Sequence, residues 1–196
     1  MIKRLFDIVF SSMMLVLLSP VLIGITIYVA IDSPGGPFFR QIRVGRSAQH
    51  FKLWKFRTMR PSSEASGQLT VGANDMRITR AGKILRKYKL DELPQLLNVW
   101  LGEMSMVGPR PEVPKYVALY NQDQKRVLTI RPGITDQASL EYFEENELLA
   151  KSNNPEQTYI DEIMPAKLKL NLEYLKHHSF AGDLVIIART AKRMFF

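Results

Sequence analysis

Residues 78–112 read ITRAGKILRKYKLDELPQLLNVWLGEMSMVGPRPE, and this stretch decides the expected fold class. Between Arg77 and Leu90, six basic residues surround apolar side chains at helical spacing, and Ile78 to Leu90 is predicted to form a basic amphipathic helix suited to an anionic surface. A second helix is expected to begin at Pro94, because proline is favoured in a first helical turn, and to end near Gly102. The centre of the chain is therefore expected to be helical.

Two adjacent carboxylates, Asp91 and Glu92, stand between these predicted helices. One interpretation is structural, because acidic residues at a helix start gain from the helix dipole and from free backbone amides. The other interpretation is functional: an ionised carboxylate among cations can attack phosphorus or hold a divalent cation. The residues themselves leave both interpretations open.

Arg110 lies between Pro109 and Pro111, which restrict the backbone on both sides. A guanidinium on such a stiff turn suits bidentate phosphate binding, although an ordinary loop arginine would look the same. Arg131, in the sequence Arg131-Pro132-Gly133, offers a second arginine of this kind.

Upstream, residues 38–45 and 51–57 alternate apolar and polar side chains and predict a hairpin of two short strands. Lys55 and Arg57 alternate with Trp54 and Phe56, so the two cations would share a face. Such a face fits either a nucleic-acid surface or the wall of a diphosphate site. With this hairpin the expected fold class is α+β and mainly helical.

Ile8 to Ile31 is an uncharged run of 24 residues, about 36 Å long as a helix and thus long enough to cross a bilayer. Ser19-Pro20 interrupts it, which predicts a bend, and Ser19 can bond a freed carbonyl. Basic residues flank both ends and favour the cytoplasmic side. A re-entrant helix and a kinked single-pass anchor both fit this pattern.

The composition narrows the class of protein. The 196 residues carry 27 Lys and Arg against 19 Asp and Glu, a net charge of +8, which predicts a polyanionic partner. The absence of cysteine excludes a disulfide scaffold and a thiolate site.

Further expectations are a loop at 61–75, a helix at about 114–129, a solvated acidic face at 141–147 and helices over 165–196 with a break near 179–182.

In combination these motifs resemble the bacterial sugar transferase family, in its small monotopic phosphoglycosyl transferase form. The resemblance covers nearly the whole chain and rests on KRLFDIVFS with the Ser19-Pro20 break, FKLWKFRTMR at 51–60, the 78–112 block, RPGIT at 131–135 and the closing YLKHHSFAGDLVIIARTAKRM. After RPGIT many relatives continue with glycine, whereas this chain reads Asp136-Gln137; that departure leaves the sugar's identity open.

The resemblance implies transfer of a phospho-sugar from a UDP-sugar to undecaprenyl phosphate, with release of UMP and a requirement for Mg²⁺. Asp91 matches the family's nucleophile and Glu92 its partner in the dyad, and both are the expected metal-binding residues. Arg110 is expected near the nucleotide or its phosphates. Other expected substrate-binding residues lie in the matching motifs: Lys55, Arg57, Arg86, Arg131 and Asp183.

The resemblance also implies an organisation in which residues 1–32 form a re-entrant membrane helix. Residues 33–196 would form one catalytic domain, with amphipathic interfacial helices, on the cytoplasmic face of the bacterial inner membrane, against anionic lipid. Such an enzyme would catalyse the first membrane step of glycoconjugate assembly, through an aspartyl-phospho-sugar intermediate, and no nucleic acid would be its partner. The rival classes are a membrane-anchored nucleic-acid-binding protein and a glycosyltransferase that moves sugar alone; the oligomeric state stays open.

Overall fold

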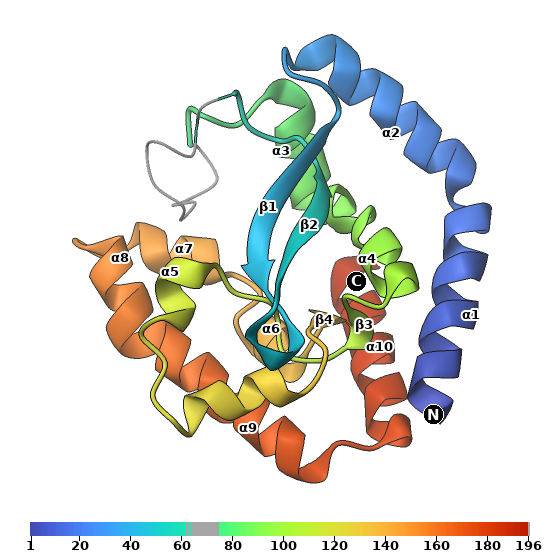
Figure 1. Cartoon of the computed structure of the whole chain (residues 1–196). Coiled ribbons are helices and arrows are strands. Elements are labelled where there is room, and N and C mark those ends of the chain that lie inside the picture. The colour runs from blue at the N-terminus through green and yellow to red at the C-terminus, as the bar shows by residue number, and fades with distance from the viewer. Residues whose placement is uncertain (62, 64–74, 196) are drawn as a thin grey trace.

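The computed structural model describes residues 1–61, 63 and 75–195 and is mainly helical around a short antiparallel hairpin (Figure 1). The coarse fold class expected from the sequence is therefore confirmed. The predicted loop at 61–75 falls largely outside the described residues, as does Phe196 of the predicted C-terminal helix.

The apolar N-terminal run forms two helices, α1 (Ile2–Leu17) and α2 (Ser19–Asp32), which meet at an angle of 63°. The predicted bend is thus present, and the Ser19 hydroxyl donates to the Val16 carbonyl at 2.8 Å, as expected. Within the described residues no single helix has the length and apolarity to cross a membrane, whereas this bent pair together meets both conditions.

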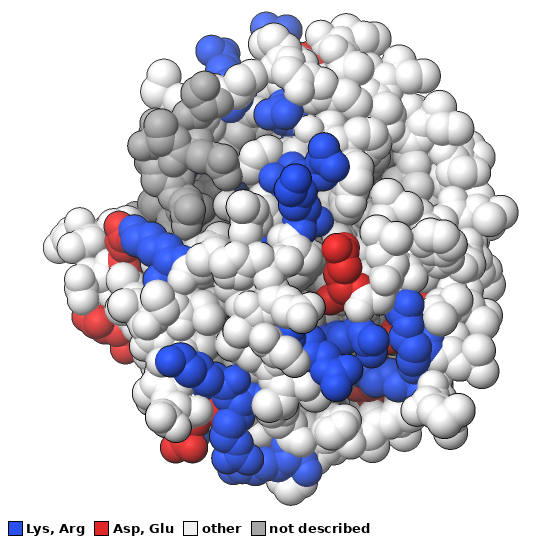
Figure 2. Space-filling model, in the orientation of Figure 1, with Lys and Arg blue, Asp and Glu red and all other residues white. Residues whose placement is uncertain are grey.

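These two helices run along one edge of the molecule and expose large apolar side chains, among them Val16 at 76% and Ile31 at 82% (Figure 1). The same edge is almost free of charge in Figure 2. An apolar surface of this extent is characteristic of a protein or membrane interface. On its inner side α1 is anchored by buried Asp7, which accepts hydrogen bonds from Ser105 Oγ at 3.1 Å and from the Met106 amide at 3.0 Å.

The predicted hairpin is confirmed: β1 (Phe38–Val44) pairs with β2 (His50–Phe56). It packs near α3 (Arg80–Lys87) and α4 (Gln95–Leu101), which lie within the two helices expected from the 78–112 block. At Gly82 a Cβ would lie 2.1 Å from the Thr58 carbonyl oxygen, so only glycine lets α3 approach the end of the hairpin so closely.

A second, parallel pair of strands joins β3 (Ser105–Val107) to β4 (Gly133–Thr135). Strands of three residues are too short to show an alternating pattern, so the sequence did not predict them. The continuous helix expected at 114–129 is wrong. Instead α5 (Pro114–Val117) and a 3₁₀ helix (Gln124–Thr129) are separated by a turn, in which Asn121 and Gln124 each accept the other's backbone amide at 2.9 Å.

The C-terminal part contains α6 (Gln137–Glu141), α7 (Glu145–Ala150) and α8 (Pro155–Thr158), a π-helical turn (Tyr159–Ile163), α9 (Met164–His177) and α10 (Phe180–Phe195). The predicted break between the last two helices is present. α10 returns to the N-terminus, where the Phe180 and Phe6 rings meet edge to face at 5.3 Å. In Figure 1 the C-terminus lies beside α4, whereas the N-terminus lies at the outer edge of the molecule beside the start of α10.

Candidate active site

Asp91 and Glu92 lie on a single 3₁₀ turn (Leu90–Glu92) between α3 and α4. Lys89 adopts a left-handed backbone conformation with φ of 54°, which ends α3 and reverses the chain immediately before the two acids. The following helix begins after Pro94, as the sequence predicts. The pair therefore projects from a tight turn fixed by a helix on each side.

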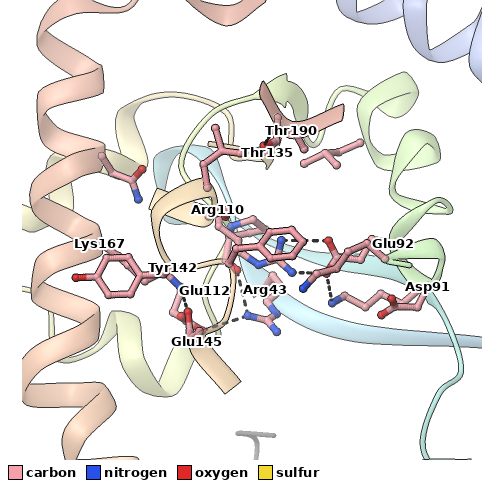
Figure 3. A pocket seen from close by; sticks show the side chains of 18 of the residues that line it. Arg43, Asp91, Glu92, Arg110, Glu112, Thr135, Tyr142, Glu145, Lys167 and Thr190 are labelled. Atoms are coloured by element: carbon pink, nitrogen blue, oxygen red, sulfur yellow. Dashed lines mark hydrogen bonds and ion pairs between the residues drawn. The ribbon is translucent and has the colours of Figure 1, made fainter. Parts of the chain in front are cut away.

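The dyad faces a cavity of about 460 Å³ (Figure 3). Its walls come from the hairpin, the α3–α4 turn, the Pro-Arg-Pro turn and the C-terminal helices, which are far apart in the sequence. Four of the basic residues lining the cavity are Lys55, Arg86, Lys89 and Arg110. Three of these belong to the predicted substrate-binding set, so the structure gathers those three beside the predicted nucleophile.

Glu92 is tied to two of these cations. Lys55 Nζ donates to Glu92 Oε1 at 3.0 Å, and the Arg110 guanidinium bonds both carboxylate oxygens, at 3.2 Å from Nη1 to Oε2. Burial opposes ionisation of Glu92, but Arg110 and Lys55 together hold its pKa well below the usual range. Glu92 is consequently an ionised anchor for the two cations.

Asp91 has a different environment, although it is only 7% exposed. Among the described residues no group donates a hydrogen bond to its carboxylate. Burial, followed by the negative charge of Glu92, raises the pKa of Asp91, while Lys55 and Arg86 oppose that shift. The nearby cations thus limit the rise in the pKa of Asp91 but do not reverse it. Its oxygens remain available to a ligand in the cavity.

The turn that carries Arg110 is held from both sides. Its backbone amide donates to Asp136 Oδ2 at 3.0 Å, and Arg43 donates to the Pro111 carbonyl at 3.1 Å. Asp136 also accepts the Ser139 amide at 2.6 Å and so caps α6. The residue that departs from the family pattern is therefore a buried anchor for the Arg110 turn, whereas Ser139 lines the cavity.

Three other predicted substrate-binding residues lie outside the cavity lining and make structural contacts. Arg57 donates to the carbonyls of Gly35, Gly36 and Phe38 and closes the connection between α2 and β1. Arg131 donates to the Gly102 carbonyl at the end of α4 at 2.7 Å. Asp183 binds Lys3 and accepts from the Tyr174 hydroxyl at 2.6 Å.

The cavity is also lined by charged residues that were not predicted as site residues from the sequence: Arg43, Glu112, Glu145 and Lys167. Glu112 binds Arg43 at 3.1 Å and accepts from the Tyr159 hydroxyl. Lys167 pairs with Glu145 at 2.6 Å, so Glu145 does not belong to the solvated acidic face expected at 141–147. Glu112 directly follows the Pro-Arg-Pro turn and could have been noticed there, but no local signal connects residues 145 and 167.

The same cavity has an apolar wall formed by the N-terminal helix. Phe10 and Met14 line it from α1 and Leu18 from the break that follows, together with Leu96 and Met106. These side chains continue inward from the exposed apolar edge described above. One cavity therefore joins a ring of cations around Asp91 to the surface of an apolar helix.

The donor set also bears on whether the dyad can hold Mg²⁺. Within the described part of the chain, no group of three His, Cys, Asp or Glu side chains is placed so that it could hold a metal ion. These residues therefore do not form a metal site made of protein ligands alone. Magnesium is commonly held by one or two carboxylates together with substrate phosphates, and Asp91 has oxygens available for that arrangement. The residues fit such a site through Asp91, with Glu92 already bound to Arg110 and Lys55.

Comparison with known proteins places these features in a family. The family model described as "Bacterial sugar transferase" matches residues 1–196, and the chain belongs to this family. Among its relatives is a UDP-glucose:undecaprenyl-phosphate glucose-1-phosphate transferase of Klebsiella pneumoniae, which is 36% identical over 98% of this chain and 40% of the relative.

Two further relatives show the range of the family. A UDP-N-acetylgalactosamine-undecaprenyl-phosphate N-acetylgalactosaminephosphotransferase of Aeromonas hydrophila is 32% identical over 97% of this chain and 43% of the relative. An uncharacterized sugar transferase of Bacillus subtilis is 36% identical over 98% of this chain and 87% of the relative. The chain thus spans about two fifths of the Klebsiella and Aeromonas relatives but most of the Bacillus one.

Proposed function

We propose that this protein is a phosphoglycosyl transferase that moves a phospho-sugar from a UDP-sugar to undecaprenyl phosphate and releases UMP. The observation that carries the proposal is that one cavity is lined both by Asp91, whose carboxylate is near Lys55, Arg86 and Lys89, and by an apolar helix. A water-soluble diphosphate and a lipid phosphate can meet in such a place. The names of the Klebsiella and Aeromonas relatives describe the same reaction class.

In the proposed mechanism Asp91 attacks the phosphorus next to the sugar. An Asp91 Oδ–P bond forms, and the bond from that phosphorus to the bridging oxygen of the diphosphate breaks, so UMP leaves with the electron pair. A phosphate oxygen of the lipid then attacks the same phosphorus and displaces Asp91, which regenerates the carboxylate. Two displacements at one nucleophile let the two large substrates use the cavity in turn.

The cavity cations have distinct tasks in this mechanism. Arg110 and Lys55 bind substrate phosphates, and Glu92 keeps both of them oriented before the substrate enters. Arg86 lies on α3 next to the dyad, where Thr58 Oγ1 accepts from its Nε at 2.9 Å. When bound at Asp91, Mg²⁺ would reduce the negative charge on the transferred phosphoryl group and on the departing UMP.

The proposal includes a location at the cytoplasmic face of the bacterial inner membrane. The bent pair α1–α2 enters and leaves one leaflet, and the exposed Arg40 meets anionic lipid on the cytoplasmic side. The reaction would be the first membrane step in the assembly of a glycoconjugate.

The test supplies purified protein with a UDP-sugar and Mg²⁺ in the absence of lipid. Wild type is expected to release at most one UMP per enzyme and to gain the mass of a phospho-sugar on the peptide containing Asp91; Asp91→Asn should do neither. If no burst occurs and initial rates give intersecting lines with both substrates varied, the covalent mechanism is wrong. Release of UDP would identify a sugar-only glycosyltransferase, and steeply salt-dependent nucleic-acid binding without UMP release would identify a nucleic-acid-binding protein.

A further inference from the structure

The cavity contains two buried polar atoms that have no hydrogen-bond partner within the described part of the chain: Ser139 Oγ on α6 and Asn171 Oδ1 on α9. Asn171 is only 5% exposed. An unpaired buried polar atom is costly, and native proteins leave few of them. Two of them, on two residues that line one cavity, point to a ligand that supplies the missing hydrogen bonds.

These two residues lie away from the dyad. Asn171 is one helical turn after Lys167 on α9, and Ser139 is three residues before Tyr142 at the end of α6, so each pair shares a helix face. In Figure 3, Lys167 and Tyr142 lie on the opposite side of the view from Asp91, with Arg110 and Glu92 between them. Ser139 and Asn171 therefore belong to the end of the cavity beyond Arg110.

This end has a different chemistry from the rest of the cavity. The cation near it, Lys167, is already paired with Glu145 at 2.6 Å, and the hydroxyls of Thr135 and Thr190 bond each other at 2.6 Å. Phosphates would be bound at the cationic end, and a polyprenyl chain would contact the apolar wall of α1. A neutral end with one unpaired carbonyl oxygen and one unpaired hydroxyl suits a polyhydroxyl ring, whose hydroxyls both donate and accept hydrogen bonds.

We propose that Ser139 and Asn171 form the sugar subsite, in which the Asn171 carbonyl oxygen accepts from a sugar hydroxyl and the Ser139 hydroxyl completes the recognition. This inference rests on the proposed function and adds the part of the substrate that this end of the cavity recognises. It also assigns a role to the segment after RPGIT: Asp136 anchors the Arg110 turn and fixes Ser139 through its amide.

The experiment measures Asn171→Leu and Ser139→Ala with the UDP-sugar that wild type uses best, and with UDP alone as a competitive inhibitor. Because UDP lacks the sugar, each variant is expected to raise the KM for the UDP-sugar about threefold to tenfold while the UDP inhibition constant stays within about twofold of wild type. Asn171→Leu also removes an unpaired buried polar atom, so its Tm is expected to equal or exceed that of wild type.

Ser33→Ala is the matched control for Ser139→Ala, because Ser33 Oγ is also buried and unpaired but Ser33 does not line the cavity. It should change neither constant. Equal shifts in KM and in the UDP inhibition constant would mean that these residues bind the nucleotide, which would overturn the proposal. The proposal would also be overturned if neither variant changed the KM for the UDP-sugar. If wild type released no UMP from any UDP-sugar, the proposed function itself would fail, which is a different result.

Discussion

At the scale of single residues, the main result is that the two adjacent acids differ in environment. Glu92 is bound by Arg110 and Lys55, which hold its pKa low, whereas burial and the neighbouring charge raise the pKa of Asp91. Environments that separate the pKa values of paired carboxylates often mark distinct chemical roles. The geometry therefore supports Glu92 as the positioning acid and Asp91 as the reactive acid. The residues themselves, two adjacent acids, do not show which one has which role.

Arg110→Lys tests whether a planar guanidinium is needed. Lysine can still neutralise Glu92 but cannot bond a phosphate in bidentate fashion. We expect kcat/KM for UMP release to fall about tenfold to a hundredfold, equivalent to about 1.5–3 kcal/mol, with a Tm close to that of wild type. A fully active lysine variant would show that Arg110 is an ordinary ion-pair residue.

The two limbs of the pH–rate profile should report on different groups. Asp91 must be ionised to attack, so activity should fall as the pH drops through its raised pKa. Burial lowers the pKa of Lys55 despite Glu92, so its charge, and with it phosphate binding, should be lost at a lower pH than for an ordinary lysine. We expect Lys55→Arg to move the alkaline limb of kcat/KM to higher pH, because a guanidinium stays protonated.

The acid limb of the same pH–rate profile serves as an internal control. Because it reports on Asp91, Lys55→Arg should leave it near its wild-type position. An alkaline limb that does not move in Lys55→Arg would mean that Lys55 does not bind substrate in its charged form.

At the scale of secondary structure elements, α1 has two functions in the fold. Its outer side is exposed and apolar, while its inner side contributes Phe10 and Met14 to the cavity wall, and its buried Asp7 accepts hydrogen bonds from β3. The end of α2 is tied to the catalytic elements as well, because Asp32 accepts the Ala81 amide at the start of α3 at 2.8 Å. α1 is thus part of the cavity wall, and together with α2 it is a candidate membrane anchor.

Asp7→Ala tests this attachment. The change leaves the buried Met106 amide without an acceptor, which should cost about 1–3 kcal/mol of stability. We expect a lower Tm in detergent and slower UMP release, because the apolar wall of the cavity loses its anchor. Met13→Ala, at a 52% exposed position of the same helix, should change neither property by a comparable amount. Equal effects of both substitutions would argue against a specific role for Asp7.

At the scale of the whole molecule, the almost charge-free edge formed by α1 and α2 (Figure 2) adjoins the cavity, because Phe10 and Met14 of α1 line the same cavity as Asp91. α10 adds exposed Leu184 and Val185 and packs against the start of α1. This arrangement would place the reacting phosphates at the depth of lipid headgroups.

Topology can be tested directly, because the chain contains no cysteine. Single cysteines at Ile2 and Gln49 flank the α1–α2 pair. If the pair is re-entrant, both should be shielded from an impermeant thiol reagent added outside intact cells and both should react after lysis. Pro20→Ala should straighten the bend and expose part of the N-terminal population to the reagent. If Pro20 is unchanged and the reagent outside intact cells labels Ile2→Cys but not Gln49→Cys, the α1–α2 pair spans the membrane.

The sequence was sufficient for features that depend on local physics. The alternation at 38–57 predicted the hairpin, Ser19-Pro20 predicted the bend, and the prolines and glycines around 94–102 predicted where α4 begins and ends. Each depends on backbone restriction or on side-chain periodicity, which act over a few residues. The ordered motifs were enough to indicate the family, and the resemblance pointed to five residues that line one cavity in the fold: Asp91, Glu92, Lys55, Arg86 and Arg110.

Only the tertiary structure decided which residues share the cavity. It brings Arg43, Glu112, Ser139 and Asn171 to the same space, although they come from β1, the Pro-Arg-Pro turn, α6 and α9, and it directs Arg57, Arg131 and Asp183 to structural contacts. A basic or polar residue has the same local pattern whether it binds a carbonyl or faces a ligand. Its partner is chosen by packing between distant segments, and so is the pKa difference between Asp91 and Glu92, because burial and neighbouring charge exist only in the folded chain.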